Sequence, residues 1–200
     1  RRFSVDARVL IPRSETELLV EGVLQAIPKD APARVLDLCT GSGCIAISIA
    51  AERPLASVWA TDVSPDALAV AKQNAEALGV DGRVTFFQGN LFEPVPKDAT
   101  FDVIVSNPPY VRLDELPGLQ KEVQKEPKLA LDGGVDGLVV IRPLVVAAMP
   151  RLKAGGTLAL EISDDQGAAV KTLLDAAGAV DTRIVKDLAR LDRMVFGRAK

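Results

Sequence analysis

Short apolar runs alternate along the chain with longer segments in which apolar residues recur three and four positions apart. The short runs are typical of buried strands, and the longer segments are typical of helices with one apolar face. The apolar runs predict strands at 34–38, 57–62, 83–88, 101–105, 157–161, 180–186 and 193–197.

The periodic segments predict helices, and two of them carry recognisable start signals. Ser14 and Glu17 have the spacing of a capping box, so the first helix should begin near Glu15 and end before Pro28. Ser64 and Pro65 form a cap followed by a favourable first helical residue. Further helices are expected at 44–51, 65–78, 138–149 and 166–177.

Strands that alternate with helices indicate an α/β fold with a mostly parallel, Rossmann-like sheet covered on both faces. The last two strands have no helix between them, so they should run antiparallel to each other. The chain's 200 residues suit one globular domain. We expect residues 1–33 to form an N-terminal segment and helix that lead into the main domain at 34–200. The segment 111–137 is a long irregular loop, which is usually functional or mobile.

Composition removes several classes of protein from consideration. The net charge of −3 gives no surplus for coating nucleic acid, and the longest apolar stretches are only strand-sized, so we expect no membrane partner. The absence of histidine excludes a Ser-His-Asp triad and a His-ligated zinc, and no metal site is expected. The two cysteines, Cys39 and Cys44, are expected to be small buried residues rather than a disulfide.

A glycine turn, Asp37-Leu38-Cys39-Thr40-Gly41-Ser42-Gly43, joins the first strand to a helix. Ligands of such sheets lie at the carboxyl ends of the strands, where a helix start offers free N–H groups. The spacing Gly41-x-Gly43-x-x-Ala46 also fits a loose dinucleotide fingerprint. A plain tight turn is the alternative.

Asp62 ends the second strand, where a carboxylate can accept both hydroxyls of a ribose. A nicotinamide dinucleotide and S-adenosylmethionine both contain that ribose, and a helix-capping role for Asp62 is the alternative. Asn90 and Leu91, after the third strand, are expected to contact the adenine. Asp37 would repel a pyrophosphate but suits an ammonium group, which favours the methyl donor.

The stretch Asn107-Pro108-Pro109-Tyr110 follows the fourth strand. Each proline forces the residue before it into an extended conformation. The Asn107 side-chain oxygen and the Pro108 carbonyl can then accept both hydrogens of an NH2 group, while Tyr110 offers a flat face. Such a site would catalyse methyl transfer by positioning a poor nucleophile. The alternative is an ordinary loop in which prolines end a strand.

The sequence resembles the glutamine-N5 methyltransferases that modify bacterial peptide release factors (the HemK/PrmC family). The matching segments lie in the family's order along most of the chain: Val9-Leu10-Ile11-Pro12-Arg13-x-Glu15-Thr16-Glu17, Asp37-Leu38-x-Thr40-Gly41-Ser42-Gly43, Ser106-Asn107-Pro108-Pro109-Tyr110, Glu126-Pro127-x-x-Ala130-Leu131-Asp132-Gly133-Gly134-x-Asp136-Gly137 and Leu160-Glu161-Ile162. The stretch Asn-Pro-Pro-Tyr alone is not specific, because adenine methyltransferases also carry it.

The resemblance implies a class I S-adenosylmethionine-dependent methyltransferase fold that produces S-adenosylhomocysteine. It implies a cytoplasmic enzyme whose partner is a release factor, with no direct contact to nucleic acid. Methylation of a large-subunit ribosomal protein or of adenine in DNA or RNA is the alternative. The implied cofactor contacts are Cys39, Thr40, Gly41, Ser42, Gly43, Asp62, Leu91 and Asn107.

The resemblance also implies that Asn107, Pro108, Pro109 and Tyr110 hold the glutamine of a Gly-Gly-Gln tripeptide, with Asn107, Pro108 and Tyr110 catalytic. The loop from Glu126 to Gly137 would be a substrate surface or a lid, or else only a solvated loop. Cys39 stands where the family is expected to have glycine, and Ser14 where it has proline. We expect the catalytic domain without the family's small helical domain ahead of Phe3.

Overall fold

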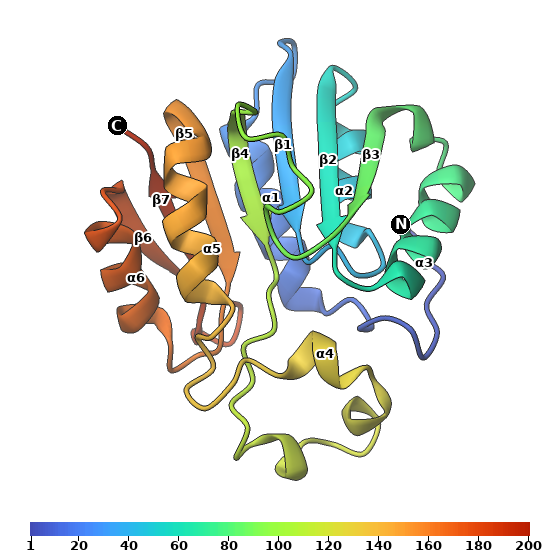
Figure 1. The fold of residues 1–200 in the computed structure, drawn as a ribbon, viewed down its shortest axis with the longest axis vertical. Coiled ribbons are helices and arrows are strands. Elements are labelled where there is room, and N and C mark those ends of the chain that lie inside the picture. Colours follow the sequence, from blue (N-terminus) through green and yellow to red (C-terminus); the bar gives the residue numbers. More distant parts are fainter.

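A seven-stranded sheet forms the centre of the molecule in the computed structural model, which describes residues 1–200 (Figure 1). The strands lie in the order β3-β2-β1-β4-β5-β7-β6. The first five in this order are parallel, and β7 runs antiparallel to both neighbours. The predicted fold class is therefore confirmed. The strands are β1 (Ala33–Leu38), β2 (Ala56–Asp62), β3 (Val84–Gln88), β4 (Phe101–Ser106), β5 (Leu152–Glu161), β6 (Val180–Lys186) and β7 (Asp192–Arg198).

Helices cover both faces of this sheet. The helices are α1 (Ser14–Ala26), α2 (Cys44–Glu52), α3 (Pro65–Ala77), α4 (Lys128–Leu131), α5 (Ile141–Ala148) and α6 (Gly167–Ala176). Buried residues of α1, α2 and α3 share one hydrophobic cluster, and those of α5 and α6 share another. The two clusters are separated by the sheet, so each set of helices packs on its own face.

Neighbouring residues within a strand point to opposite clusters. In β1, Val35 belongs to the cluster under α1 and α2, whereas Leu36 belongs to the cluster under α5 and α6. Val103 and Ile104 in β4 divide in the same way. This period of two explains why the strands read as continuous apolar runs, because a sheet buried on both faces needs apolar side chains on each.

Most boundaries agree with those predicted to within one or two residues, and the starts of α1, β5 and α5 need comment. The helix α1 starts at Ser14, with Arg13 at the N-cap and no side-chain cap, so the expected capping box is wrong. The Ser14 hydroxyl instead donates to Glu15 Oε2. Strand β5 begins at Leu152, before the predicted glycine turn, and α5 begins only at Ile141.

The order of the strands places a site between β1 and β4. From β1 the chain builds β2 and β3 on one side, then returns to build β4 and β5 on the other. Such a reversal opens a crevice at the carboxyl ends of the strands. Here the Ser106 hydroxyl donates to the Leu38 carbonyl at 2.7 Å and ties the two strand ends together.

The long segment after β4 forms an excursion, residues 111–137, at this same edge of the sheet (Figure 1). It contains α4 and two short 3-10 turns, Leu116–Gly118 and Val123–Lys125. Backbone bonds from Val111 N to the Leu131 carbonyl and from Gly133 N to the Val111 carbonyl close its base. None of the helices combines the length and the apolar character needed to cross a bilayer.

Candidate active site

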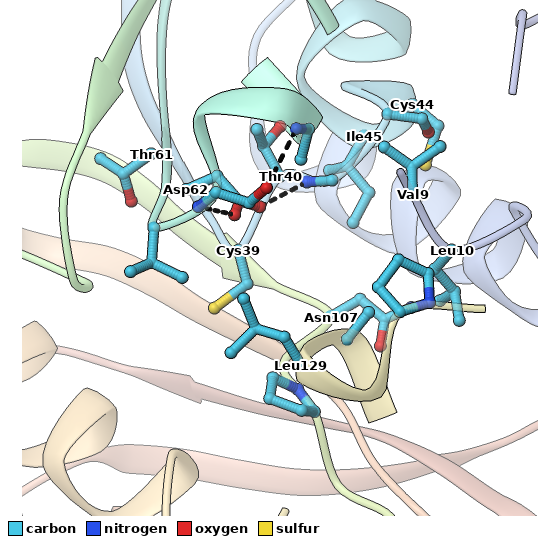
Figure 2. A pocket seen from close by; sticks show the side chains of 18 of the residues that line it. Val9, Leu10, Cys39, Thr40, Cys44, Ile45, Thr61, Asp62, Asn107 and Leu129 are labelled. Carbon is cyan, nitrogen blue, oxygen red and sulfur yellow. Dashed lines mark hydrogen bonds between the residues drawn. The ribbon is translucent and has the colours of Figure 1, made fainter. Parts of the chain in front are cut away.

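One pocket opens at the carboxyl edge of the sheet (Figure 2). Loops that follow β1, β2, β3 and β4 form much of its wall, and the N-terminal segment and the excursion complete it. The predicted site residues that line this pocket are Cys39, Thr40, Gly41, Ser42, Asp62, Asn90, Leu91, Asn107 and Pro109. The predicted residues outside its lining are Asp37, Gly43, Pro108 and Tyr110.

The glycine turn presents its backbone to the pocket. Cys39 and Gly41 have φ angles of +59° and +55°, in the left-handed region. A Cβ atom added to Gly41 would meet nothing within 4 Å, so open space lies beside this backbone. Gly43 has a different role: a Cβ there would lie 2.8 Å from Ile47 Cδ1 of α2 and 3.1 Å from Ala71 Cβ of α3, so glycine lets the start of α2 lie close to α3.

Asp37 lies behind the turn and is fully buried. Its Oδ2 atom accepts hydrogen bonds from the Thr40 hydroxyl at 2.6 Å and from the Ala46 N–H at 3.2 Å. Its Oδ1 atom is buried with no partner, and burial raises the pKa of this carboxyl group to about 7. Asp37 therefore holds the turn against α2, and its expected contact with an ammonium group stays a prediction.

Asp62 faces the pocket from the end of β2. Its Oδ2 accepts from the Gly41 N–H and its Oδ1 from the Ser64 N–H, both at 2.9 Å. Each carboxylate oxygen can accept a further hydrogen bond, so both remain available to a ligand. The side-chain cap of α3 is the Ser64 hydroxyl, which accepts from the Ala67 N–H at 3.1 Å. Burial raises the pKa of Asp62.

Asn90 and Leu91 form the part of the wall that follows β3. Leu91 has a φ of +46°, an uncommon conformation for a bulky side chain. The preceding turn is held by a bond from the Gly89 N–H to the Asp62 carbonyl at 3.0 Å. A backbone held in this conformation beside a pocket indicates a functional constraint on where Leu91 lies.

Asn107 borders the pocket (Figure 2). One end of its amide is hydrogen-bonded and the other end is free. Its Nδ2 donates to the Thr16 hydroxyl oxygen at 3.3 Å. Its Oδ1 takes part in none of the hydrogen bonds of the chain.

Tyr110 does not present its ring to this pocket. Its ring packs against the cluster under α5 and α6, and its hydroxyl donates to Glu161 Oε1 at 3.3 Å. Its carbonyl accepts from Gln166 Nε2 at 3.0 Å. The Tyr110 ring, which was expected to offer a flat face to a substrate amide, is therefore not part of the pocket lining.

Sequence reasoning missed a second wall made of apolar side chains. Val9, Leu10 and Pro12 come from the N-terminal segment, and Leu129 comes from α4, where Figure 2 shows it beside the pocket. Apolar side chains such as these cannot be recognised as binding residues from their chemistry. Only their position within the matched motifs could have indicated that they line the pocket.

An ion pair joins the two sides of that wall. Arg13 Nη2 lies 2.7 Å from Glu126 Oε1, and the Glu126 side chain is only 5% exposed. The pair connects the start of α1 to the excursion. Both residues belong to the motifs noted above, but their sequence separation gave no indication that they touch.

The two thiols beside the turn are free. Cys39 contributes to the pocket wall, and so does Cys44 at the start of α2. Burial raises the pKa of each thiol to about 12, which leaves both almost entirely protonated at neutral pH. The expected absence of a disulfide is confirmed, but both cysteines are partly exposed and not buried as predicted.

Comparison with known proteins gives the family. Residues 14–183 match the methyltransferase small domain. Release factor glutamine methyltransferases from Moorella thermoacetica and Neisseria gonorrhoeae are 47% and 46% identical to the chain. The alignments cover 96% and 99% of this chain, and 68% and 71% of those relatives.

Solved structures agree on the fold. A methyltransferase from Pyrococcus furiosus matches with a TM-score of 0.68 and 18% identity, over 98% of this chain and 87% of that one. The S-adenosylmethionine-dependent methyltransferase SibL matches with a TM-score of 0.64 and 18% identity, over 93% of this chain and 54% of that one.

S-adenosylmethionine is the cofactor of this class of enzyme, and the pocket suits it. The Gly41 backbone borders open space, the Asp62 carboxylate keeps lone pairs free for ribose hydroxyls, and Leu91 offers an apolar contact for a base. The sequence match, the fold and this pocket agree, and the chain belongs to the family of release factor glutamine methyltransferases.

Proposed function

We propose that the chain transfers a methyl group from S-adenosylmethionine to the side-chain amide nitrogen of the glutamine in a release factor's Gly-Gly-Gln motif. The names of the relatives, at 44–47% identity, support this substrate over a ribosomal protein or adenine. The same proposal assigns the chain to the cytoplasm, because its partner would be a factor of translation termination.

The arrangement of Asn107 carries the proposal. The Nδ2 end of its amide is held by Thr16, while its Oδ1 is free at the edge of the pocket. Pro108 lies outside the pocket lining, but its carbonyl is next along the chain and also accepts no hydrogen bond from the protein. Two neighbouring free acceptors match the two hydrogens of a primary amide.

These acceptors address the difficulty of the reaction. An amide nitrogen is a weak nucleophile because its lone pair is delocalised into the carbonyl. S-adenosylmethionine supplies a methyl group on a positively charged sulfur. With both amide hydrogens held, the nitrogen is fixed in the geometry for attack, and positioning of this kind accounts for several kcal/mol of barrier reduction, roughly 7–11 in favourable cases. Asn107 has no basic group, so water takes the proton after transfer.

The cofactor contacts follow the chemistry of the pocket wall. Asp62 would accept hydrogen bonds from the two ribose hydroxyls, and Asn90 would bind the edge of the adenine. Leu91 would pack on the face of that base. The backbone from Cys39 to Ser42 would lie against the amino acid part of the cofactor.

Mass spectrometry tests this proposal directly. The chain is incubated with S-adenosylmethionine and a mixture of unmethylated release factor, ribosomal proteins and duplex DNA. We expect a single added methyl group on the glutamine of the Gly-Gly-Gln motif. The Asn107→Ala variant should lose this transfer while still binding the cofactor. Gln73→Ala, which removes an exposed amide from α3, is the matched control and should keep it.

Two outcomes would overturn parts of the proposal. Methylation of a ribosomal protein or DNA, with the release factor unmodified, would show that the substrate is wrong. Full turnover by Asn107→Ala would show that the assigned mechanism is wrong.

A further inference from the structure

A network of polar side chains is hydrogen-bonded to Asn107; Thr16, its first member, also lines the pocket, whereas Glu161 does not. Thr16 comes from the first turn of α1, and Glu161 is the last residue of β5. Thr16 is 4% exposed and Glu161 is 1% exposed. Polar groups buried this deeply are kept only where they are hydrogen-bonded, and removing one partner is costly.

The hydrogen bonds among Asn107, Thr16 and Glu161 all run in one direction. The Thr16 hydroxyl donates to Glu161 Oε2 at 2.7 Å, and Asn107 Nδ2 donates to the Thr16 oxygen at 3.3 Å. A hydroxyl has one hydrogen, so once Thr16 has donated to Glu161 it can only accept from Asn107. Asn107 must therefore turn its NH2 end inward and its oxygen toward the pocket.

This constraint matters because an amide is nearly symmetric in shape. Packing alone cannot distinguish Asn107 from the same side chain rotated by half a turn. The rotated form would present an NH2 group to a substrate NH2 group, and two donors cannot bond to each other. The carboxylate of Glu161 removes this possibility, because in its ionised form it only accepts. Burial raises the pKa of Glu161, whereas the hydrogen bonds from Thr16 and Tyr110 and the positive charge of Arg193 favour its ionised form.

The second oxygen of Glu161 holds the other end of the Asn-Pro-Pro-Tyr stretch. The Tyr110 hydroxyl donates to Glu161 Oε1 at 3.3 Å. One buried carboxylate thus connects both ends of the stretch, through Thr16 on one side and directly on the other.

We infer that Thr16 and Glu161 are positioning residues that fix which end of the Asn107 amide faces the substrate. The inference rests on the proposed function, in which Asn107 Oδ1 accepts from the substrate amide. It assigns to Glu161 a part in the reaction although Glu161 touches neither substrate nor cofactor. A purely structural role, linking α1 to β5, would have different consequences for kinetics.

Two substitutions separate these roles, measured with the chain, S-adenosylmethionine and unmethylated release factor. Glu161→Gln can offer an NH2 group to Thr16, which frees the Thr16 hydroxyl to donate to Asn107 and permits the rotated amide. Thr16→Val keeps the shape of the side chain and removes the hydroxyl. We expect each to lower kcat by about 10- to 100-fold, as for loss of one buried hydrogen bond to substrate.

The remaining readouts distinguish positioning from general damage. KM and cofactor affinity should stay within about twofold of wild type, because only the orientation of Asn107 changes. Thr16→Ser retains the hydroxyl and should recover most of kcat. Thr172→Val is the control, since Thr172 is an exposed residue of α6 whose hydroxyl donates only to the Ala168 carbonyl.

Wild-type kcat in both Glu161→Gln and Thr16→Val, with Asn107→Ala inactive, would overturn the inference and leave the proposed function standing. Full activity of Asn107→Ala would instead refute the proposed function itself. Loss of kcat that Thr16→Ser does not recover, or an equal loss of cofactor binding, would also overturn the inference, because either result indicates disruption of the fold. If Glu161→Gln does not fold, the comparison of Thr16→Val with Thr16→Ser tests the inference by itself.

Discussion

The turn between β1 and α2 allows its backbone contact with the cofactor to be tested by one added methyl group. Gly41 has a φ of +55°, and a Cβ placed there would meet no atom within 4 Å. Gly79, after α3, has a φ of +66° and is equally open, but it lies outside the pocket lining. Alanine at either position therefore adds the same backbone strain, and only alanine at 41 adds an atom to the pocket.

The expected magnitudes separate the two effects. An L-residue in the left-handed region costs roughly 1–2 kcal/mol, and reduced freedom of the unfolded chain returns about 0.4–1 kcal/mol. Each variant should therefore lose about 1 kcal/mol of stability, or about 2–4 °C of Tm for a domain of this size. Crowding a well-packed ligand by one methyl group costs about 1–3 kcal/mol, so Gly41→Ala should weaken cofactor binding roughly 5- to 150-fold.

Isothermal titration calorimetry with S-adenosylmethionine, together with thermal unfolding of each variant without ligand, measures both quantities. Gly79→Ala should lose stability but bind the cofactor as wild type does. The reasoning would be refuted if Gly41→Ala also kept wild-type affinity while losing as much stability as Gly79→Ala. That result would mean that the cofactor does not lie against this turn.

Three further predictions follow from the charged and nucleophilic groups of the site. Burial raises the pKa of Asp37 from 3.8 to about 7. Between these values the unfolded chain has lost a proton that the folded chain keeps, so stability should fall as pH rises, by up to about 1.4 kcal/mol per pH unit. Asp37→Asn should make this slope smaller in urea unfolding of the cofactor-free chain, leaving the part due to Asp62 and Glu161, and an unchanged slope would contradict the assignment. Asp62→Asn replaces one acceptor oxygen by a donor and should weaken S-adenosylmethionine binding about 10- to 100-fold by calorimetry; unchanged affinity would exclude the ribose contact. Because the thiol pKa values of Cys39 and Cys44 are about 12, N-ethylmaleimide should label the folded chain at neutral pH at least about a hundredfold more slowly than the chain in denaturant, and equal rates would show that the thiols are not protected.

Much of the fold could be predicted because local pattern and global packing agree. Strands such as β1 and β4 are apolar at successive positions, which a sheet covered on both faces requires. Ser64 and Pro65 gave the start of α3 correctly, because a hydroxyl cap is a local interaction. The capping box at Ser14 failed although it is also local. There the Arg13 backbone is extended at the N-cap and its side chain pairs with Glu126, a contact with a distant segment.

The position of the last strand was beyond sequence reasoning. The missing helix between β6 and β7 showed that they are antiparallel. It did not show that β7 lies between β5 and β6, with its own edge bonded to β5. Either β6 or β7 could have paired with the free edge of β5. Which strand pairs there depends on contacts that form only when the sheet assembles.

The sequence by itself determined the class of fold, the family and the edge of the sheet that carries the chemistry. It did so because Asp62 ends one strand and Asn107 directly follows another, and parallel strands bring their carboxyl ends together. Only the tertiary structure decided which of these side chains face the pocket. Asp37 is turned behind the wall, the Tyr110 ring packs into the core, and Thr16 reaches Asn107 from 91 residues away in sequence. The physical reason is that the direction of a side chain depends on the partners that packing brings next to it. A hydrogen bond between distant segments produces no periodic pattern in the sequence, so it cannot be predicted from one.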